Sequence, residues 1–360
     1  MRFLLSGYYG FDNLGDDALL QIIVAQLKSR YPHATIDVLS AKPEVTAHEF
    51  GVLATPRWDQ AAIRDAVSEA DIVLSGGGGL FQTATSLKSL LYYAGIVRTA
   101  LRAGKRTMVF AQSVGPLDFW GKQTLRECCK GLQAATVRDE RSRALFAPLV
   151  PSTLVERTAD PVFLYEPPEV PPGLAAAGLG EASEPFAIVC VRKTAHFSEA
   201  VGALAAAVDR LAERHGVRVA FVPFGGQADA EASTLVIRKC SSKPMLISLE
   251  GLDAVAGAIR RAKFVIGVRL HGLILAARFG IPFLALSYDP KVTGLLEDLR
   301  YPLEPLWTPG TRVAPGAVDK LVDEGWARRE EVAAHLSRAA DEQRTLAERN
   351  FARLEELVRA

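Results

Sequence analysis

Short apolar runs alternate along the chain with longer segments in which apolar residues recur at helical spacing. Runs such as residues 186–192 and 264–268 are apolar over most of their length, which is typical of strands covered on both faces. The segments between such runs, for example residues 18–27, predict amphipathic helices. Strand–helix alternation on this scale predicts an α/β fold with parallel, doubly wound sheets. The predicted strands are residues 2–6, 35–40, 71–75, 107–112, 186–192, 218–224, 264–268 and 282–287.

Proline divides this pattern into two halves. Four prolines between residues 167 and 172, followed by a Gly/Ala-rich stretch, predict a linker over residues 167–183. The sequence of strand, glycine loop and helix begins anew after it, so the 360-residue chain is expected to form Rossmann-like domains over residues 1–166 and 184–325. A charged helical segment over residues 326–360 follows, and we hypothesise that it braces the first domain.

Composition excludes several classes of protein. The net charge of +1, from 42 Lys and Arg against 41 Asp and Glu, gives no overall field to attract nucleic acid. The four cysteines, of which Cys128 and Cys129 are adjacent, have neither zinc-site spacing nor the pattern of a disulfide framework, which favours a reducing compartment. No apolar run approaches the ~20 residues that span a bilayer, and residues 1–13 predict a buried strand rather than a signal peptide. We therefore expect a cytoplasmic protein.

Glycine-rich segments follow two predicted strands of the first half. Three glycines stand among residues 7–15, where the dinucleotide-binding and Walker spacings are both absent. Acidic residues at the start of the following helix would oppose a phosphate, so this loop suits sugar hydroxyls, which Asp12 and Asn13 would contact. The alternative is a turn in which Asn13 caps the helix. Four glycines at 76–79 exceed the need of a plain turn, and Gly77 and Gly78 are predicted to let a ligand approach the backbone.

Cations follow several predicted strands. Arg138 comes just after residues 135–137, and Arg192 and Lys193 end the first strand of the second half. Lys291 lies in the first turn of a helix that Pro290 begins, where a cation is unfavourable unless an anion is near. These positions predict an anion site, whereas the alternative for each is a solvated surface charge.

The strongest signal is the segment Arg269-Leu270-His271-Gly272, in which a predicted strand turns into a helix. Free backbone N–H groups, a guanidinium and an imidazole would converge there, which suits a phosphate or a carboxylate. A histidine in an apolar context is otherwise a core residue, but a buried arginine two positions earlier needs an anionic partner. The motifs of zinc proteases, serine hydrolases, Cys–His catalysis and EF-hands are absent, and no acidic cluster predicts a metal site.

Taken together, these segments resemble the polysaccharide pyruvyl transferases, most closely their CsaB-like branch. The resemblance covers nearly the whole chain and is carried by residues 7–16, 76–82, 113–116, 138–139, 268–272 and 287–291. It implies a GT-B-like arrangement of two Rossmann-like domains with the active site in the interdomain cleft. The domain 1–166 would bind the acceptor and the domain 184–325 would bind phosphoenolpyruvate.

The resemblance also implies a reaction. Members of the family move the enolpyruvyl unit of phosphoenolpyruvate onto a sugar as a pyruvate ketal, with phosphoenolpyruvate as co-substrate and no cofactor or metal. In the CsaB-like branch the acceptor is an N-acetylmannosamine residue of a lipid-linked precursor, and the product is a secondary cell-wall polymer that anchors S-layer proteins. Such an acceptor would bring a cytoplasmic enzyme into peripheral contact with the inner face of the plasma membrane.

Each candidate residue then has an expected role. Arg138, Arg192, Arg269 and Lys291 would neutralise phosphoenolpyruvate, and His271 would act as general acid or as phosphate ligand, because imidazole titrates near neutral pH. Asp12 would serve as a base toward the sugar. Catalysis is thus assigned to His271, Arg269 and Asp12, and substrate binding to Asn13, Gly77, Gly78, Arg138, Arg192, Leu270 and Lys291.

Two other functions fit the same pattern. A GT-B glycosyltransferase using a nucleotide sugar would share the fold and need an acidic residue for the ribose, for which Glu250 is the candidate. A non-catalytic sugar-binding protein would keep the fold without turnover, although the intact set of Arg269, His271 and Lys291 argues against it.

Overall fold

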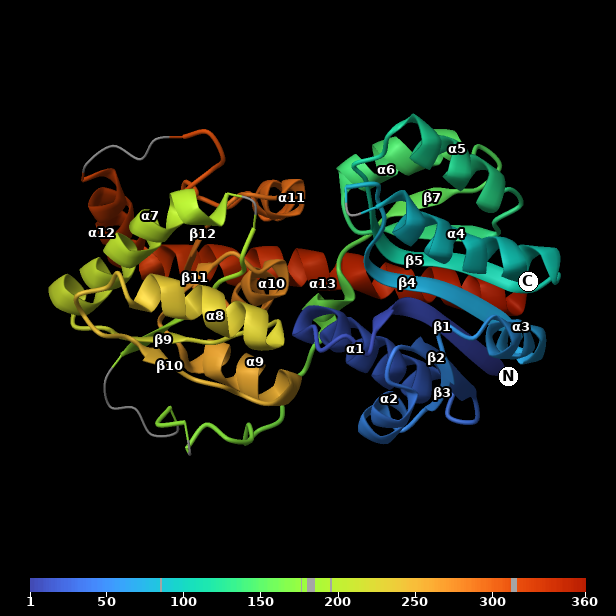
Figure 1. The fold of residues 1–360 in the computed structure, drawn as a ribbon, viewed down its shortest axis with the longest axis horizontal. Coiled ribbons are helices and arrows are strands. Elements are labelled where there is room, and N and C mark those ends of the chain that lie inside the picture. Colours follow the sequence, from blue (N-terminus) through green and yellow to red (C-terminus); the bar gives the residue numbers. More distant parts are fainter. Residues whose placement is uncertain (85, 176, 180–184, 195, 312–315) are drawn as a thin grey trace. The chain divides into compact units, whose positions relative to one another are not determined.

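The computed structural model describes residues 1–84, 86–175, 177–179, 185–194, 196–311 and 316–360. Packing divides the chain into two compact units. Unit 1 comprises Met1–Tyr165 together with Gln343–Ala360, and unit 2 comprises Glu166–Glu342. Figure 1 shows the elements of both units in the order of the sequence. The domain boundaries expected at residues 166, 184 and 326 stay predictions, because packing does not show which segments fold independently.

Unit 1 is built on a seven-stranded parallel sheet in the order β3-β2-β1-β4-β5-β6-β7. Its central strands are apolar, and Phe3, Leu4 and Leu5 of β1 are at most 2% exposed because helices cover both faces. The strands are β1 (Arg2–Tyr9), β2 (Thr35–Ser40), β3 (Leu53–Pro56), β4 (Ile72–Phe81), β5 (Arg106–Val114), β6 (Ala134–Val137) and β7 (Val155–Arg157). The helices are α1 (Leu14–Arg30), α2 (Pro43–Phe50), α3 (Gln60–Glu69), α4 (Leu87–Arg102), α5 (Phe119–Cys128), α6 (Glu140–Phe146) and two short 3₁₀ turns, η1 (Ala147–Leu149) and η2 (Pro161–Leu164).

Unit 2 contains a five-stranded parallel sheet in the order β10-β9-β8-β11-β12. The strands are β8 (Phe186–Cys190), β9 (Arg218–Phe221), β10 (Met245–Leu246), β11 (Phe264–Gly267) and β12 (Phe283–Ala285). The helices are α7 (Phe197–Asp209) with its π-helical end η3 (Arg210–Arg214), α8 (Gly226–Ile237), α9 (Gly251–Arg261), α10 (Leu270–Arg278), α11 (Pro290–Asp298) and α12 (Ala317–Ala327). Two parallel sheets built from alternating strands and helices confirm the predicted α/β class.

One predicted strand end is wrong. The strand expected over residues 71–75 continues through the four glycines to Phe81, because β4 pairs with β5 as far as Val114. Gly77 and Gly78 have φ values of 73° and 83° within this strand, and the register shifts between Gly78 and Phe81. Positive φ is open to glycine at little cost, so the glycines shape a bulged strand end instead of a loop.

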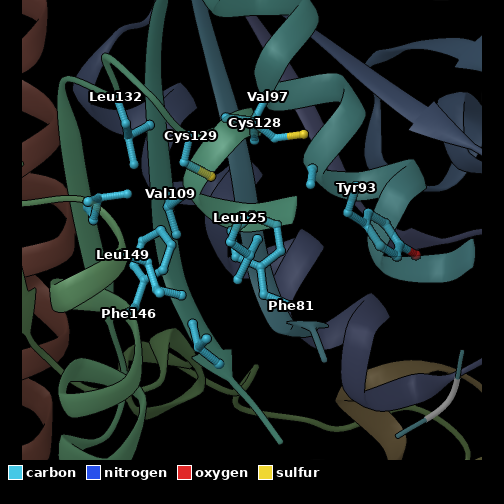
Figure 2. Close-up of a cluster of buried hydrophobic side chains, with 14 of the residues drawn as sticks. Phe81, Tyr93, Val97, Val109, Leu125, Cys128, Cys129, Leu132, Phe146 and Leu149 are labelled. Atoms are coloured by element: carbon cyan, nitrogen blue, oxygen red, sulfur yellow. The ribbon is translucent and has the colours of Figure 1, made fainter. Parts of the chain in front are cut away.

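An apolar cluster of unit 1 lies between β4, β5 and the helices α4 to α6. Figure 2 shows Phe81, Val97, Leu125, Phe146 and their neighbours in it. Cys128 and Cys129 belong to this cluster as free thiols, and burial raises the pKa of Cys129. The adjacent cysteines are therefore packing residues at the end of α5.

A long C-terminal helix, α13 (Arg329–Arg359), contributes to both units. In unit 1 it buries Phe351, whose ring lies 5.1 Å from that of Phe110. The Asn350 amide donates to the Ala159 carbonyl at 2.9 Å, and Arg30 forms an ion pair with Glu355 at 2.8 Å. Bracing by this segment stays a prediction, for which these contacts supply the physical basis. Within the described part of the chain, no helix has the length and apolarity that crossing a membrane requires.

Candidate active site

In unit 1 the loop after β1 places Asp12 and Asn13 at the carboxyl end of the sheet. Asp12 is held at a φ of 54° and its carboxylate pairs with Lys42 at 2.6 Å, while 70% of its side chain stays exposed. Asn13 is the N-cap residue of α1, but its side-chain amide donates to the Asp16 carboxylate. The Asn13 side chain, which was expected to cap the helix, thus binds the Asp16 carboxylate instead. The Asp12 carboxylate of this loop is exposed, so a sugar hydroxyl can reach it.

The predicted ligand glycines of β4 have a local structural reason. A Cβ atom at Gly78 would lie 2.8 Å from Oδ1 of Asp16, and one at Gly77 would lie 3.2 Å from Leu19. Helix α1 therefore leaves little space for a side chain at these positions, and their positive φ values disfavour one further. Contact of Gly77 and Gly78 with a substrate stays a prediction.

Asp17 lies in the first turn of α1 among other acids. Burial, reinforced by Asp16, Glu49 and Asp12, raises its pKa from 3.8 to about 7, against the opposing effect of Lys42. A carboxyl group that titrates near neutral pH at a strand end is suited to proton transfer, although structural clusters also shift pKa values. Sequence reasoning placed Asp17 only as an opponent of phosphate, because its burial is not visible in the sequence.

This raised pKa predicts how unit 1 depends on pH. The folded protein holds a proton on Asp17 up to about pH 7, whereas the unfolded chain releases it near the ordinary pKa of 3.8. Stability from this group is therefore complete below about pH 4 and is lost as pH rises through about 7, each pKa unit being worth about 1.4 kcal/mol. Urea unfolding of the Asp17→Asn variant should show a flatter pH dependence and greater stability at pH 8 than the parent. An unchanged pH dependence would contradict the shift.

Arg138, predicted to bind substrate, lies in a buried ion pair. Its Nη1 atom is 2.6 Å from Asp160, its Nε donates to Ser113 at 2.7 Å, and the two charged side chains are 6% and 4% exposed. The guanidinium thus joins the ends of β5 and β6 to the segment after β7. The charge of Arg138 is thus compensated by Asp160, and its guanidinium is buried. A role of Arg138 in substrate binding stays a prediction.

In unit 2 the segment after β11 gives Arg269 a partner that the sequence did not indicate. Arg269 is the N-cap residue of α10, and its Nε and Nη2 donate to the two oxygens of Asp229, each at 2.7 Å. Asp229 is 1% exposed and also accepts from the Phe224 amide at 3.2 Å. The bidentate pair fixes the guanidinium at the strand end, and Arg269 remains 13% exposed. Asp229 is therefore a positioning residue for Arg269.

Gly225 makes room for this arginine. A Cβ atom at residue 225 would lie 2.0 Å from Nη2 of Arg269. The Gly225→Ala variant should displace the guanidinium from Asp229 and cost about 1–3 kcal/mol of unfolding free energy, as overpacking generally does. Urea denaturation measures this loss. The Gly226→Ala variant serves as comparison, because a Cβ atom there meets no neighbour and the variant shows only the cost of a φ of 56°. Equal stability of the Gly225→Ala variant and the parent would show that Arg269 can move freely.

Leu270 and His271 lie in the first turn of α10, directly after Arg269, which caps the helix. The Nε2 atom of His271 is buried. A Cβ atom at Gly272 would lie 3.3 Å from Phe224 and 3.4 Å from Cys190, so the helix packs closely on these residues. This close packing holds α10 against β8. The imidazole is thereby set at the helix N-terminus, where backbone N–H groups are free of helical partners.

Further cations stand at the neighbouring strand ends. Arg192 lies two residues beyond β8 and Arg269 two beyond β11, and these strands are adjacent in the sheet. Tyr288, three residues beyond β12, lies near both arginines. Burial raises the pKa of Tyr288, and the charges of Arg192 and Arg269 oppose this rise. Lys291 follows in the first turn of α11, whose N-cap Asp289 accepts from the Lys291 amide at 2.9 Å. The structure thus brings the predicted cations of unit 2 to one edge of its sheet.

The sequence reasoning assigned no site role to Asp17, Gly225, Asp229 or Tyr288, nor to Arg57, which is discussed below. Glu250, the ribose candidate, is the exposed N-cap residue of α9. Over the described ranges, no group of three or more His, Cys, Asp or Glu side chains is placed to hold a metal ion. The groups described above are carboxylates in unit 1 and guanidinium, imidazole and phenol groups in unit 2.

Comparison with solved structures shows the fold. The UDP-GlcNAc 2-epimerase of Neisseria meningitidis, solved with UDP-GlcNAc, is 10% identical, with a TM-score of 0.63 over 100% of each chain. The Anabaena protein HepE, solved with UDP-glucose, is 12% identical, with a TM-score of 0.62 over 100% of this chain and 98% of its own. A glycosyltransferase from Rickettsia africae is 9% identical, with a TM-score of 0.63 over 99% and 98%. These likenesses confirm the GT-B-like fold class expected from the sequence.

Comparison at the level of sequence shows the family. No curated protein matches the chain. The family model described as polysaccharide pyruvyl transferase matches residues 13–290. The match begins at Asn13 and ends at Pro290, so it contains most of the strand-end residues described above, among them Arg192, Arg269 and His271, and stops one residue short of Asp12 and of Lys291. Because it covers well over half of the sequence, the chain belongs to the polysaccharide pyruvyl transferase family.

Proposed function

We propose that this protein transfers a pyruvyl group from phosphoenolpyruvate to a pair of sugar hydroxyls, forming a pyruvate ketal. Membership of the family supports a transferase that acts in polysaccharide biosynthesis. The observation that carries the donor is the gathering of Arg192, Arg269 and Tyr288 at adjacent strand ends of unit 2, with His271 at a helix N-terminus. Phosphoenolpyruvate bears a phosphate and a carboxylate, which guanidinium groups and free backbone N–H groups bind well.

The proposed reaction has two steps. His271 donates a proton to the methylene carbon of the enol while a sugar hydroxyl attacks the neighbouring carbon, so the double bond is replaced by a C–H and a C–O bond. The second hydroxyl then attacks the same carbon, and the C–O bond to phosphate breaks. One hydroxyl proton replaces that given by His271, and the other leaves with phosphate. In this proposal Asp12, whose carboxylate is exposed, accepts a hydroxyl proton, and Arg269, held by Asp229, stabilises the departing phosphate.

For the acceptor we propose an N-acetylmannosamine residue of a lipid-linked cell-wall precursor. This choice is supported by the resemblance of residues 7–16 and 268–272 to the CsaB-like branch. The product would be an anionic polymer that anchors S-layer proteins, and the enzyme would work in the cytoplasm at the inner membrane face.

The decisive experiment measures phosphate release from phosphoenolpyruvate with and without a synthetic N-acetylmannosaminyl–N-acetylglucosamine lipid diphosphate. Acceptor-dependent release, with a product heavier by one pyruvate less one water, is the expected result. Release without any acceptor would point to a phosphatase, and no release with any amino-sugar acceptor would overturn the proposal.

A second candidate is a glycosyltransferase that uses a nucleotide sugar. It is favoured by the solved structures of similar fold that hold UDP-glucose and UDP-GlcNAc. Thermal shift separates the two donors. Phosphoenolpyruvate should raise the melting temperature of this protein and UDP-GlcNAc should not, and the opposite result would favour the glycosyltransferase.

A further inference from the structure

A row of aromatic rings lies at the carboxyl edge of the unit 1 sheet. It consists of Tyr8, Phe11, Trp58 and Tyr92, and we call it the aromatic shelf. Tyr8 stacks on Phe11 with ring centroids 4.2 Å apart and planes 14° apart, Phe11 meets Trp58 at 6.5 Å, and Trp58 meets Tyr92 at 5.4 Å. The row is open to solvent, since Trp58 is 64% and Tyr8 39% exposed. Large aromatic side chains exposed together need an explanation, because isolated exposure is common but clusters mark binding surfaces.

The position of the shelf is that of a ligand site. Trp58 lies two residues beyond the end of β3, and Tyr8 and Phe11 flank the end of β1. Both strands are parallel members of one sheet, so these residues stand at its carboxyl edge, where open α/β sheets bind ligands. Asp12, with its exposed carboxylate paired to Lys42, follows Phe11 directly. The shelf is therefore bordered by charged groups that can hydrogen-bond hydroxyls.

A buried arginine, Arg57, contacts three rings of the aromatic shelf. Arg57 is 2% exposed, and its guanidinium carbon lies 4.9 Å from the ring centres of both Phe11 and Trp58 and 4.6 Å from that of Tyr92. Nη1 donates to the Gly7 carbonyl at 2.8 Å and Nη2 to the Tyr93 hydroxyl at 3.0 Å. In Figure 2 the hydroxyl of Tyr93 points away from the labelled core side chains.

The charge of Arg57 is unusual for a buried group. No Asp or Glu within the described ranges forms an ion pair with it, and its buried Nε atom has no hydrogen-bond partner. Burying a cation without an acid is costly, and cation–π contacts with surrounding rings recover part of that cost. The result is a set of rings fixed in place before any ligand arrives, which lowers the entropic cost of binding.

We propose that the aromatic shelf binds a sugar ring, with the apolar C–H face of a pyranose stacked on Trp58 and its hydroxyls directed to Asp12 and Lys42. A flat exposed indole beside hydroxyl-binding charges matches the amphipathic surface of a sugar. The shelf, as the acceptor subsite, rests on the proposed function; as a sugar-binding surface it stands on the geometry of unit 1 alone.

The test compares two tryptophans of equal exposure in the same unit. Trp58 is 64% exposed, and Trp120, which lies beside Phe119 at the start of α5, is 66% exposed. Strands β3 and β5, which precede them, are separated in the sheet by β2, β1 and β4. Binding of N-acetylmannosaminyl–N-acetylglucosamine is measured by calorimetry and by quenching of tryptophan fluorescence, in the parent, Trp58→Ala, Trp58→Phe and Trp120→Ala proteins. Melting temperatures establish that each variant is folded.

We expect Trp58→Ala to weaken disaccharide binding by about tenfold or more, a change of about 1.4 kcal/mol or more. Trp58→Phe should restore part of it, and Trp120→Ala should bind like the parent. Phosphoenolpyruvate binding should be unchanged in all four proteins. Parental affinity in Trp58→Ala, an equal loss in Trp120→Ala, or failure of the parent to bind the disaccharide would each overturn the shelf as a sugar site.

The outcome separates the two proposals. Trp58-dependent sugar binding without any pyruvyl transfer would uphold the shelf and overturn the proposed function. Pyruvyl transfer by Trp58→Ala with an unchanged KM for the acceptor would uphold the function and overturn the shelf.

Discussion

Replacement of Arg269 by alanine is expected to lower the stability of unit 2 by about 3–5 kcal/mol and to abolish turnover of phosphoenolpyruvate. The stability loss follows from Asp229, which is 1% exposed and would lose both hydrogen bonds from its bidentate partner. The sequence analysis assigned Arg269 to catalysis, and the buried carboxylate adds a contribution of this residue to stability. Urea unfolding measures the first effect, and phosphate release measures the second.

A matched double variant separates the two effects. In Arg269→Gln/Asp229→Asn both charges are removed and an amide–amide hydrogen bond can replace the ion pair, so stability should return close to that of the parent. Turnover should not return, because the proposed mechanism requires the Arg269 guanidinium to stabilise the departing phosphate. A double variant with parental turnover would show that Arg269 serves packing only.

Replacement of His271 by glutamine is expected to lower kcat by about 10²–10⁴-fold, the usual contribution of a general acid. Glutamine keeps a polar group of similar length at the start of α10 but carries no transferable proton. If His271 acts as general acid, kcat falls while the KM for phosphoenolpyruvate stays near its parental value. If it acts as phosphate ligand, the KM rises instead.

The control for this prediction is His33→Gln, which alters an exposed histidine of unit 1 that lies outside the predicted site. Loss of turnover in both variants would indicate a general effect of the substitution. Parental kcat and KM in His271→Gln would remove this residue from the mechanism.

The fold could be predicted from the sequence because its strands are local patterns. The apolar runs at residues 35–40 and 264–268 need no distant partner to be visible, and both are strands in the structure. The strand end at the glycines was mistaken because β4 continues only through pairing with β5, which is a tertiary effect.

The candidate site could be predicted only as far as single residues carry a signal. Arg269 and His271 stand next to a strand end in the sequence, whereas Asp229 comes 40 residues before Arg269 and is joined to it only by the sheet. Arg57 lies in no motif, and of the rings around its guanidinium only Trp58 is its neighbour in sequence, whereas Phe11 and Tyr92 come from distant segments. The roles of such residues depend on their burial and on their contact partners, which the local sequence does not predict.

The composition of unit 1 has a consequence for biosynthesis. Its N-terminal 165 residues emerge first from the ribosome, but Phe351 and Asn350, which complete its packing, are made last. Unit 2 consists of one continuous segment and can finish folding while unit 1 still exposes the surface that α13 will cover. The usual order, in which the N-terminal part folds first during synthesis, is therefore reversed for the completion of this protein.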